Sequence, residues 1–181
     1  MPTLAGYTQH KSLHKTGRSE VCAALRDADG REVLLKWYLS ERPDSSQVWA
    51  QFEYEALRKC EGPGIPAVFE LLSAGKLPVL VLERVPGISL NRITALPDPA
   101  GFLELAIQLA EIVARVHEHH LLHRDISPGN VMLDRRTQKV HLIDFEMARP
   151  LGAAVRSDGA RTGPTGLAGT LPYIPPEQTG R

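Results

Sequence analysis

Residues 123–145 read HRDISPGNVMLDRRTQKVHLIDF, the most specific pattern in the sequence. Asn130 stands five residues after Asp125, and Asp144 stands fourteen residues after Asn130. Two short apolar runs between Asn130 and Asp144 predict a β-hairpin. A carboxylate can orient a hydroxyl group, while an amide oxygen and a second carboxylate can hold Mg²⁺ against phosphates. The spacing therefore indicates a catalytic loop, then a hairpin, then a cation ligand where the hairpin ends.

This constellation resembles the eukaryotic-like protein kinase family, whose catalytic loop reads H-R-D-x-x-x-x-N and whose metal-binding segment begins with Asp-Phe. The resemblance implies that Asp125 is the catalytic base and that Asn130 is a further catalytic residue. Asn130 and Asp144 would bind the Mg²⁺, or Mn²⁺, that accompanies ATP. His123 and Phe145 would be packing residues that hold these groups in place. Five chemically distinct positions in register argue against a plain polar turn between buried segments.

Composition limits the classes of protein to consider. The 181 residues are 43% hydrophobic and 23% charged, and 21 basic and 21 acidic residues give a formal net charge of zero. This length can bury one core, or two small lobes that share a cleft. The zero balance gives no electrostatic case for nucleic acid or an anionic membrane as a partner. Because the apolar runs are short and the N-terminus lacks a signal-peptide core, we expect a cytoplasmic protein.

Short apolar runs separated by turn residues predict an antiparallel sheet in the first half of the chain. An Asp29-Gly30 pair between two of these runs is a hairpin signal. Helices are expected where apolar residues recur at helical spacing. The expected strands are 21–25, 33–39, 68–72 and 78–82, and the expected helices are 45–60 and 101–120.

Together with the family resemblance, these elements imply an α+β, protein kinase-like fold with two lobes. The N-lobe, 1–85, would contain a five-stranded antiparallel sheet with one helix. The C-lobe, 86–181, would be incomplete and mainly helical, and the hinge between the lobes would span 83–87. The catalytic loop would be 123–130, and the activation segment would be 144–177.

Residues 33–36 read VLLK and resemble the V-A-I-K strand of the family, whose Lys binds the α- and β-phosphates of ATP. Glu53 and Glu55, on the expected helix 45–60, compete to pair with Lys36. The register of the corresponding family helix favours Glu53, because Glu55 would point roughly 160 to 200° away on a 3.6-residue period. We therefore expect a catalytic ion pair between Lys36 and Glu53.

The resemblance also implies where ATP binds. Leu82 would be the gatekeeper residue at the back of the adenine pocket. Glu83 and Val85 would offer backbone groups to adenine, a position inferred from the Pro-Gly pair that follows them. The expected ATP contacts are Lys36, Val21, Leu34, Leu82, Glu83, Val85 and Met132.

Residues 169–177 read GTLPYIPPE and match the G-T-x-x-Y-x-x-P-E ending of the activation segment in Ser/Thr-directed members of the family. Arg124 would bind a phosphate on this segment, with Ser157, Thr162 and Thr165 as candidate acceptors. The segments FEYEALRKCEGPGIPAV and PPEQTGR resemble the N-terminal kinase domain of large bacterial multi-sensor signalling kinases. Family members continue for several helices after Pro-Glu. We therefore expect a truncated kinase domain, with C-terminal helices or further signalling domains in a full-length protein.

Three features depart from the family pattern. His14, Thr16 and Ser19 stand where the phosphate-covering loop G-x-G-x-x-G has glycines, and side chains there should loosen or reshape the nucleotide clamp. Ser127 replaces a Lys that contacts the transferred phosphate, and Glu146 replaces the Gly after Asp-Phe. The last two features resemble kinase-like enzymes that act on small alcohols and the kinase domains of lanthipeptide synthetases.

Three functions therefore stay open. The first is a serine/threonine protein kinase that transfers the γ-phosphoryl group of ATP to protein hydroxyls in signalling. The second is a kinase of small alcohols or lanthipeptide precursors, favoured by the last two departures. The third is a non-catalytic nucleotide-binding pseudokinase or scaffold, favoured by the truncation and the missing glycines. The first is favoured by an intact set of catalytic parts, namely Lys36, Glu53, Asp125, Asn130 and Asp144.

Overall fold

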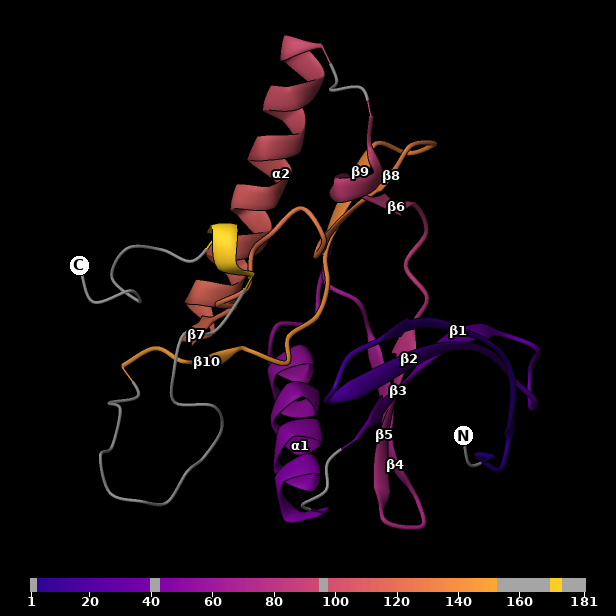
Figure 1. Cartoon of the computed structure of the whole chain (residues 1–181). Coiled ribbons are helices and arrows are strands. Elements are labelled where there is room, and N and C mark those ends of the chain that lie inside the picture. The colour runs from indigo at the N-terminus through magenta and orange to yellow at the C-terminus, as the bar shows by residue number, and fades with distance from the viewer. Residues whose placement is uncertain (1–2, 40–42, 95–97, 153–169, 174–181) are drawn as a thin grey trace. The chain divides into compact units, whose positions relative to one another are not determined.

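The computed structural model of the chain describes residues 3–39, 43–94, 98–152 and 170–173 (Figure 1). The chain divides into two compact units. The first unit comprises Met1–Arg58 and Ala67–Arg84, and the second comprises Lys59–Pro66 and Val85–Arg181. The short segment Lys59–Pro66 therefore belongs with the later part of the chain, although it lies between two elements of the first unit.

The first unit is a five-stranded antiparallel sheet with one helix, as predicted. Its strands follow the order β1-β2-β3-β5-β4, so β3 is the central strand. The helix begins two residues earlier than predicted, at Pro43, because the fixed φ of proline suits the first turn of a helix. The elements are β1 (Tyr7–Lys15), β2 (Ser19–Arg26), β3 (Glu32–Tyr38), α1 (Pro43–Lys59), β4 (Val68–Ala74) and β5 (Leu77–Glu83).

Strand β3 divides its side chains between the two faces of the sheet. Val33, Leu35 and Trp37 are fully buried and form the core of the unit with apolar residues of β2 and β5. Because side chains alternate along a strand, Lys36 and Tyr38 lie on the face opposite this core. The central strand thus supplies the core on one side and polar groups on the other.

Charged hydrogen bonds at the surface hold the turn between β2 and β3. Arg26 donates two hydrogen bonds to the carboxylate of Asp29, at 2.9 and 2.5 Å, and the backbone N–H of Arg31 donates a third, at 3.1 Å. The Arg26 side chain, and after it the Arg31 N–H, lower the pKa of Asp29 from an ordinary 3.8 to about 2. The folded protein therefore favours the charged form of Asp29.

We expect the contribution of Asp29 to stability to depend on pH. Because the folded pKa is depressed, the contribution is fully present above pH 3.8 and is lost as the pH falls towards about 2. An NMR titration of the Asp29 carboxyl group should have its midpoint near pH 2 in the wild type. Arg26→Gln should move that midpoint up towards 3.8, and a wild-type midpoint already at 3.8 would contradict the proposed network.

The second unit contains α2 and two small antiparallel sheets. Asp98 caps α2 by accepting a hydrogen bond from Gly101 N–H at 2.8 Å, and Pro99 occupies the first helical position. The predicted helix 101–120 therefore begins two residues earlier and ends at Glu118. The elements are β6 (Ile88–Ser89), the 3₁₀ helix η1 (Leu90–Arg92), α2 (Pro99–Glu118), β7 (Leu121–Leu122), β8 (Val131–Asp134), β9 (Lys139–Leu142), β10 (Arg149–Pro150) and the 3₁₀ helix η2 (Leu171–Tyr173). Within the described residues this unit fits the predicted α+β class.

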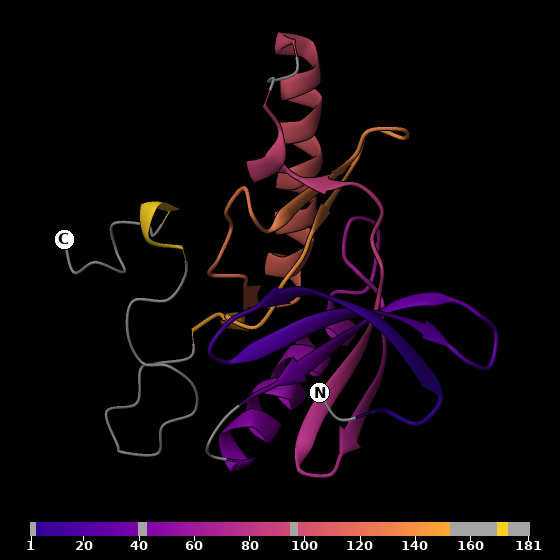
Figure 2. The same cartoon turned by 45° about the vertical axis from the view of Figure 1, so that its right-hand side comes forward.

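The predicted hairpin is confirmed as β8 and β9, which form a sheet in the order β6-β8-β9. The hairpin lies beside α2 in both views (Figures 1 and 2). The side-chain amide of Gln108 on α2 donates to Gln138 O at 3.0 Å and accepts from Val140 N–H at 3.1 Å. Leu142 N–H donates to Gly64 O at 2.8 Å. Both α2 and the segment that contains Gly64 are thus hydrogen-bonded to β9.

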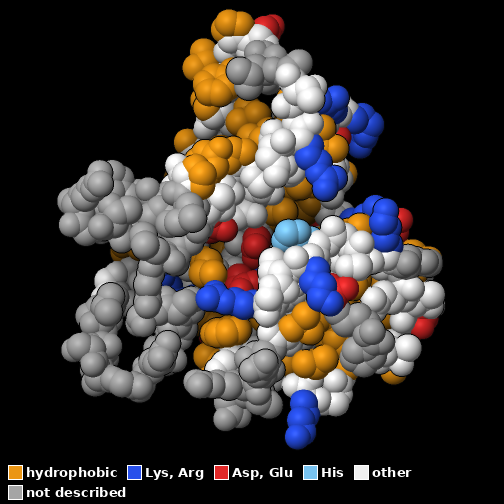
Figure 3. Space-filling model, viewed as in Figure 1, with side chains coloured by type: hydrophobic (Ala, Val, Ile, Leu, Met, Phe, Trp, Pro, Cys, Tyr) orange, Lys and Arg blue, Asp and Glu red, His pale blue; other side chains and the backbone are white. Residues whose placement is uncertain are grey.

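One part of α2 exposes apolar side chains. Phe102, Leu103 and Ile107 are 51%, 60% and 57% exposed, and hydrophobic side chains (orange) are visible over α2 in the upper part of Figure 3. The buried side chains of the same helix are Ile112 and Val116, nearer its C-terminal end. Among the residues that the structure describes, no helix combines the length and apolarity that a membrane span requires.

Gly64 has a left-handed backbone conformation, with φ at +81°, and lies close to α2. A Cβ atom at this position would be 2.3 Å from Ile112 Cδ1 and 3.1 Å from Val140 O. Arg115 on α2 donates to the neighbouring Pro63 O at 2.6 Å, which fixes the segment against the helix. Glycine is therefore required here both by the backbone angle and by the space available.

Gly64→Ala is expected to lower the free energy of unfolding by about 2–4 kcal/mol, because backbone strain and overpacking add. Gly75→Ala is a matched control. Gly75 also has a positive φ, +63°, but no atom lies within 4 Å of its added Cβ. It should therefore lose only the strain contribution, roughly 1–2 kcal/mol. Urea unfolding measures both variants, and equal losses would show that the contact with Ile112 does not matter.

Candidate active site

The predicted ion pair between Lys36 and Glu53 is present in the first unit. Lys36 Nζ donates to both carboxylate oxygens of Glu53, at 2.8 and 3.1 Å. The pair is buried, since Lys36 is 3% exposed and Glu53 is 1% exposed. Glu55 is exposed and accepts a hydrogen bond from Gln51. The choice of Glu53 over Glu55 as the partner of Lys36 is therefore confirmed.

Tyr38 is a third member of this group, and it was not among the predicted site residues. Its side chain is fully buried, and its hydroxyl donates a hydrogen bond to Glu53 Oε2. Taking an ion pair out of water is unfavourable unless further hydrogen bonds satisfy its polar atoms, and the Tyr38 hydroxyl supplies one. Strand spacing contained the signal, because Tyr38 stands two residues after Lys36 and therefore lies on the same face of β3.

Four of the predicted ATP contacts share one face of the sheet. Val21 is the cross-strand partner of Lys36, and Leu34 is the cross-strand partner of Leu82. Residues directly opposite each other in antiparallel strands project from the same face. Leu34 and Lys36 stand two residues apart on β3, so they share that face as well. The sheet therefore brings Val21, Leu34, Lys36 and Leu82 to one surface.

The remaining predicted ATP contacts are Glu83, Val85 and Met132. Glu83 N–H donates to Ala67 O at 2.8 Å, and its carboxylate accepts from Ala67 N–H at 3.0 Å. Its backbone N–H is therefore already used, so the backbone group that it could offer to adenine is its carbonyl oxygen. Val85 and Met132 belong to the second unit, where Met132 pairs with Ser89 of β6. The roles of these three residues in nucleotide binding stay predictions.

Asp125 and Asn130 contact each other within the loop of the second unit. Asn130 Nδ2 donates to Asp125 Oδ2 at 2.8 Å and to the Asp125 backbone oxygen at 2.9 Å. Because the amide nitrogen faces Asp125, the amide oxygen faces the other way, as a cation ligand would need to. Ile143 N–H donates to Asn130 O at 2.9 Å, which places the backbone of the next residue, Asp144, alongside Asn130.

His123 and Phe145 form a buried ring pair. Their centroids are 4.7 Å apart and their planes meet at 75°, an edge-to-face contact. Asp125 N–H donates to His123 Nδ1 at 3.3 Å, so Nδ1 is an acceptor and Nε2 carries the proton that it donates to Ile143 O at 3.2 Å. The histidine thus joins the loop at Asp125 to the segment that contains Ile143 and Phe145.

Thr170 binds the second oxygen of the Asp125 carboxylate. Its backbone N–H and its hydroxyl both donate to Asp125 Oδ1, at 2.7 and 2.9 Å. Since Asn130 occupies Oδ2, hydrogen bonds fix the carboxylate through both of its oxygens. Thr170 belongs to the motif matched at 169–177, but no local pattern indicates this contact, which joins residues 45 positions apart.

Two non-glycine residues at this site have a left-handed backbone. Arg124 and Asp144 each have φ at +66°. Such conformations are unfavourable by roughly 1–3 kcal/mol and persist where surrounding contacts impose them. Aspartate adopts them more readily than arginine does. Strain immediately before Asp125 and at Asp144 itself is typical of functional loops.

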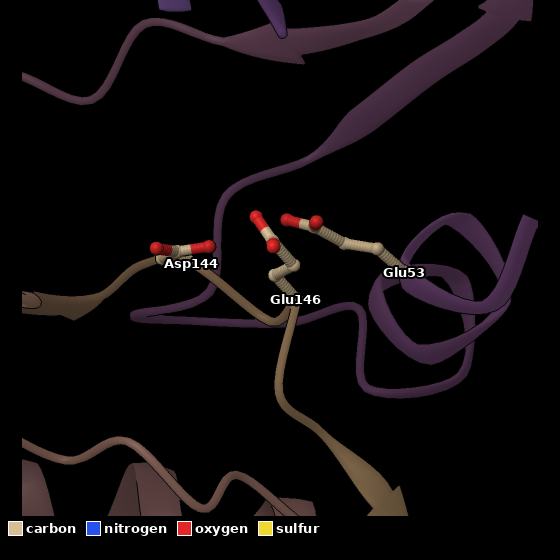
Figure 4. Close-up of side chains that lie close together, drawn as sticks. All are labelled: Glu53, Asp144 and Glu146. Carbon is tan, nitrogen blue, oxygen red and sulfur yellow. The ribbon is translucent and has the colours of Figure 1, made fainter. Parts of the chain in front are cut away.

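Asp144 and Glu146 offer two carboxylates in the second unit, with oxygens within 4.8 Å of each other. Figure 4 shows how both side chains project from the segment after β9, and it also shows Glu53 projecting from α1 of the first unit. Asp144, Glu146 and the amide oxygen of Asn130 are hard oxygen donors, the type that Mg²⁺ and Mn²⁺ prefer. The residue types therefore fit the predicted divalent cation, and Glu146 adds a donor to the predicted pair.

Arg149 on β10 is a second cation close to Arg124. Burial, and then the positive charge of Arg124, lower the pKa of Arg149. Two neighbouring guanidinium groups repel each other, and an anion such as phosphate relieves that repulsion. No motif marks Arg149, so it was not among the predicted site residues. The phosphate acceptors predicted for this site, Ser157, Thr162 and Thr165, lie outside the described residues.

Comparison with known proteins identifies the family. Residues 7–181 match the protein kinase domain. The chain belongs to the protein kinase family. The resemblance inferred from residues 123–145 is therefore confirmed, and with it the kinase-like α+β fold. The finer likeness to multi-sensor kinases stays a prediction.

Several relatives of this kinase chain are named as bacterial serine/threonine-protein kinases. A protein of Corynebacterium efficiens, named a probable serine/threonine-protein kinase, is 32% identical over 181 residues, which cover 95% of this chain and 27% of the relative. The serine/threonine-protein kinase pkn2 of Myxococcus xanthus is 31% identical over 174 residues, 93% of this chain and 21% of the relative. The serine/threonine-protein kinase PknB of Mycobacterium leprae is 29% identical over 171 residues, which cover 90% of this chain and 27% of the relative. The chain thus spans about a quarter of the length of these relatives.

Proposed function

We propose that the chain is the catalytic part of an ATP-dependent serine/threonine protein kinase. The observation that supports this most is the fixation of Asp125 through both carboxylate oxygens, by Asn130 and by Thr170. A carboxylate oriented in this way can accept the proton of a substrate hydroxyl. The hydroxyl oxygen then bonds to the γ-phosphorus of ATP while the bond to the β-phosphate oxygen breaks, which leaves a phosphorylated Ser or Thr and ADP.

Further residues of each unit would bind the nucleotide. Lys36 would contact the α- and β-phosphates, and Glu53 would keep Lys36 in place. Asn130 and Asp144, with Glu146 beside them, would hold Mg²⁺ or Mn²⁺. That cation supplies positive charge against the negative charge of the phosphates. Because ATP is the phosphoryl donor, the chain would act in the cytoplasm. Its partner would be a protein that offers a Ser or Thr hydroxyl.

A kinase of small alcohols or lanthipeptide precursors is the second candidate. Ser127 stands where protein kinases have a Lys on the transferred phosphate, and it is 5% exposed within the loop. Loss of one preorganised electrostatic contact commonly lowers a rate by about 10² to 10³. Thr170 favours the protein kinase, since it belongs to the activation-segment motif of Ser/Thr-directed enzymes and contacts Asp125 directly.

With Mg²⁺ or Mn²⁺ and radiolabelled ATP, the chain is expected to label a generic protein substrate. Asp144→Asn should lower this labelling by at least about 10²-fold, because it removes a charged cation ligand and keeps the shape of the side chain. Asp98→Asn is the matched control in the same unit. Asp98 caps α2, and asparagine caps helices about as well, so labelling should not change.

The outcomes of this assay separate the three functions. Labelled small alcohols in place of labelled protein would support the second candidate. ATP binding without any transfer would support a non-catalytic nucleotide-binding pseudokinase or scaffold. Labelling that survives Asp144→Asn would contradict the assignment of the cation site.

The turn between β1 and β2 stands where protein kinases have the glycine-rich loop. Thr16 N–H donates to Ser19 O at 2.8 Å, and the N–H groups of Arg18 and Ser19 donate to Thr16 Oγ1 at 3.1 and 3.0 Å. The Arg18 guanidinium lies over the ring of Trp49 on α1, 5.5 Å from its centroid. The backbone N–H groups of Thr16, Arg18 and Ser19 therefore donate hydrogen bonds within the turn. In a phosphate-binding loop, groups of this kind would donate to the phosphates.

Thr16→Ala is expected to raise the affinity for Mg-ATP by roughly 2- to 5-fold, because it releases the N–H groups of Arg18 and Ser19. Thr8→Ala removes a hydroxyl from β1, the strand that precedes the turn, where Thr8 donates to Asp27 at 2.8 Å, and should leave the affinity unchanged. Fluorescence titration with a labelled ATP analogue measures both variants. If Thr16→Ala binds no better than Thr8→Ala, the closed turn does not limit nucleotide binding.

A further inference from the structure

We propose that Tyr38 is a positioning residue of the kinase, whose hydroxyl holds the Glu53 carboxylate in the orientation that receives Lys36. The inference rests on the proposed function, in which Lys36 contacts the phosphates of ATP. Tyr38 lies outside the kinase motifs described above. Each group involved lies within the first unit.

The three side chains form one hydrogen-bonded cluster. Lys36 Nζ donates to both oxygens of Glu53, at 2.8 and 3.1 Å, and the Tyr38 hydroxyl donates to Glu53 Oε2. Lys36 Nζ also lies 5.5 Å from the centroid of the Tyr38 ring. Both donors come from the same face of β3, and the acceptor comes from α1. Rotation of the Glu53 side chain would therefore break bonds to two residues at once.

Burial makes the orientation of Glu53 depend on these donors. Tyr38 is 0% exposed, and Lys36 and Glu53 are nearly as deeply buried. A buried carboxylate has about four acceptor sites, and a single ammonium group cannot fill them. The Tyr38 hydroxyl donates a further hydrogen bond to the carboxylate. Because this donor is neutral, it leaves the ion pair between Glu53 and Lys36 intact. The rigid ring of Tyr38 holds this donor with few rotatable bonds.

The alternative is that Tyr38 only fills space in the sheet. Tyr38→Phe keeps the ring and removes the hydroxyl, so it tests the hydrogen bond alone. Tyr7→Phe is a matched control in the same sheet, because the Tyr7 hydroxyl donates to the carboxylate of Glu70 at 3.2 Å. Both substitutions remove a tyrosine-to-glutamate hydrogen bond, but Tyr38 alone shares its glutamate with Lys36.

The test measures kcat/KM for ATP and the affinity for a fluorescent ATP analogue with Mg²⁺, on the 181-residue chain. Tyr38→Phe should lower both quantities by roughly 3- to 30-fold, the scale of one hydrogen bond to a charged group. Tyr7→Phe should leave both within about twofold, since distant sites act independently. In a Glu53→Gln background, Tyr38→Phe should cause no further loss, because its effect passes through the Glu53 carboxylate.

Other results would contradict the role of Tyr38, its action through Glu53, or the proposed function. An active wild type whose Tyr38→Phe and Tyr7→Phe variants behave alike overturns the role of Tyr38 and leaves the proposed function intact. A loss from Tyr38→Phe that persists in full with Glu53→Gln shows that Tyr38 does not act through Glu53. A wild type that neither binds nor uses ATP overturns the proposed function, and this inference with it. If Tyr38→Phe does not melt cooperatively, Tyr38→Met, which also lacks a donor and adapts to irregular space, takes its place with the same expected loss.

Discussion

A buried carboxylate is the constraint on which the first unit depends. The carboxylate of Glu53 on α1 is buried, so it requires an opposite charge and further hydrogen-bond donors. Strand β3 supplies the charge from Lys36 and a further donor from Tyr38. The helix and the central strand therefore cannot shift against each other without leaving a charge unpaired in the interior. The position of α1 therefore decides where the Lys36 ammonium group lies on its face of the sheet.

In the second unit, hydrogen-bond donors also fix a carboxylate, although this one is less deeply buried. Asp125 is fixed by neutral donors, from Asn130 on one oxygen and Thr170 on the other, with no ammonium group among these bonds. These neutral donors fix the orientation of the carboxylate without placing a positive charge against it. The strained backbone at Arg124 and Asp144 indicates that contacts around the loop, including the His123 ring, over-determine its conformation.

Local pattern explains what could be predicted from the sequence. The hairpin of β8 and β9 and helix α2 follow from side-chain period and motif spacing, and element boundaries differ by about two residues where proline begins a helix. The pairing of Lys36 with Glu53 follows from the register of the family resemblance. Strand spacing places Tyr38 on the same face of β3 as Lys36. The contacts that Tyr38, Thr170 and Arg149 make could not be predicted in the same way. Each owes its role to a contact across the chain, and tyrosine, threonine and arginine at those positions have ordinary local explanations. The docking of Lys59–Pro66 was missed because a Gly-Pro-Gly turn indicates where a helix ends, not what the turn packs against.

Gln108 and Gly64 have a consequence for how the protein behaves in solution. Strand β9 is the last strand of its sheet, and its N–H groups at Val140 and Leu142 bond to the Gln108 side chain and to Gly64 O. An open edge strand would present these groups as a template for another molecule's strand. A side-chain amide and a loop carbonyl here imitate the missing neighbour, so the edge is closed to intermolecular β-pairing and to the aggregation that such pairing begins.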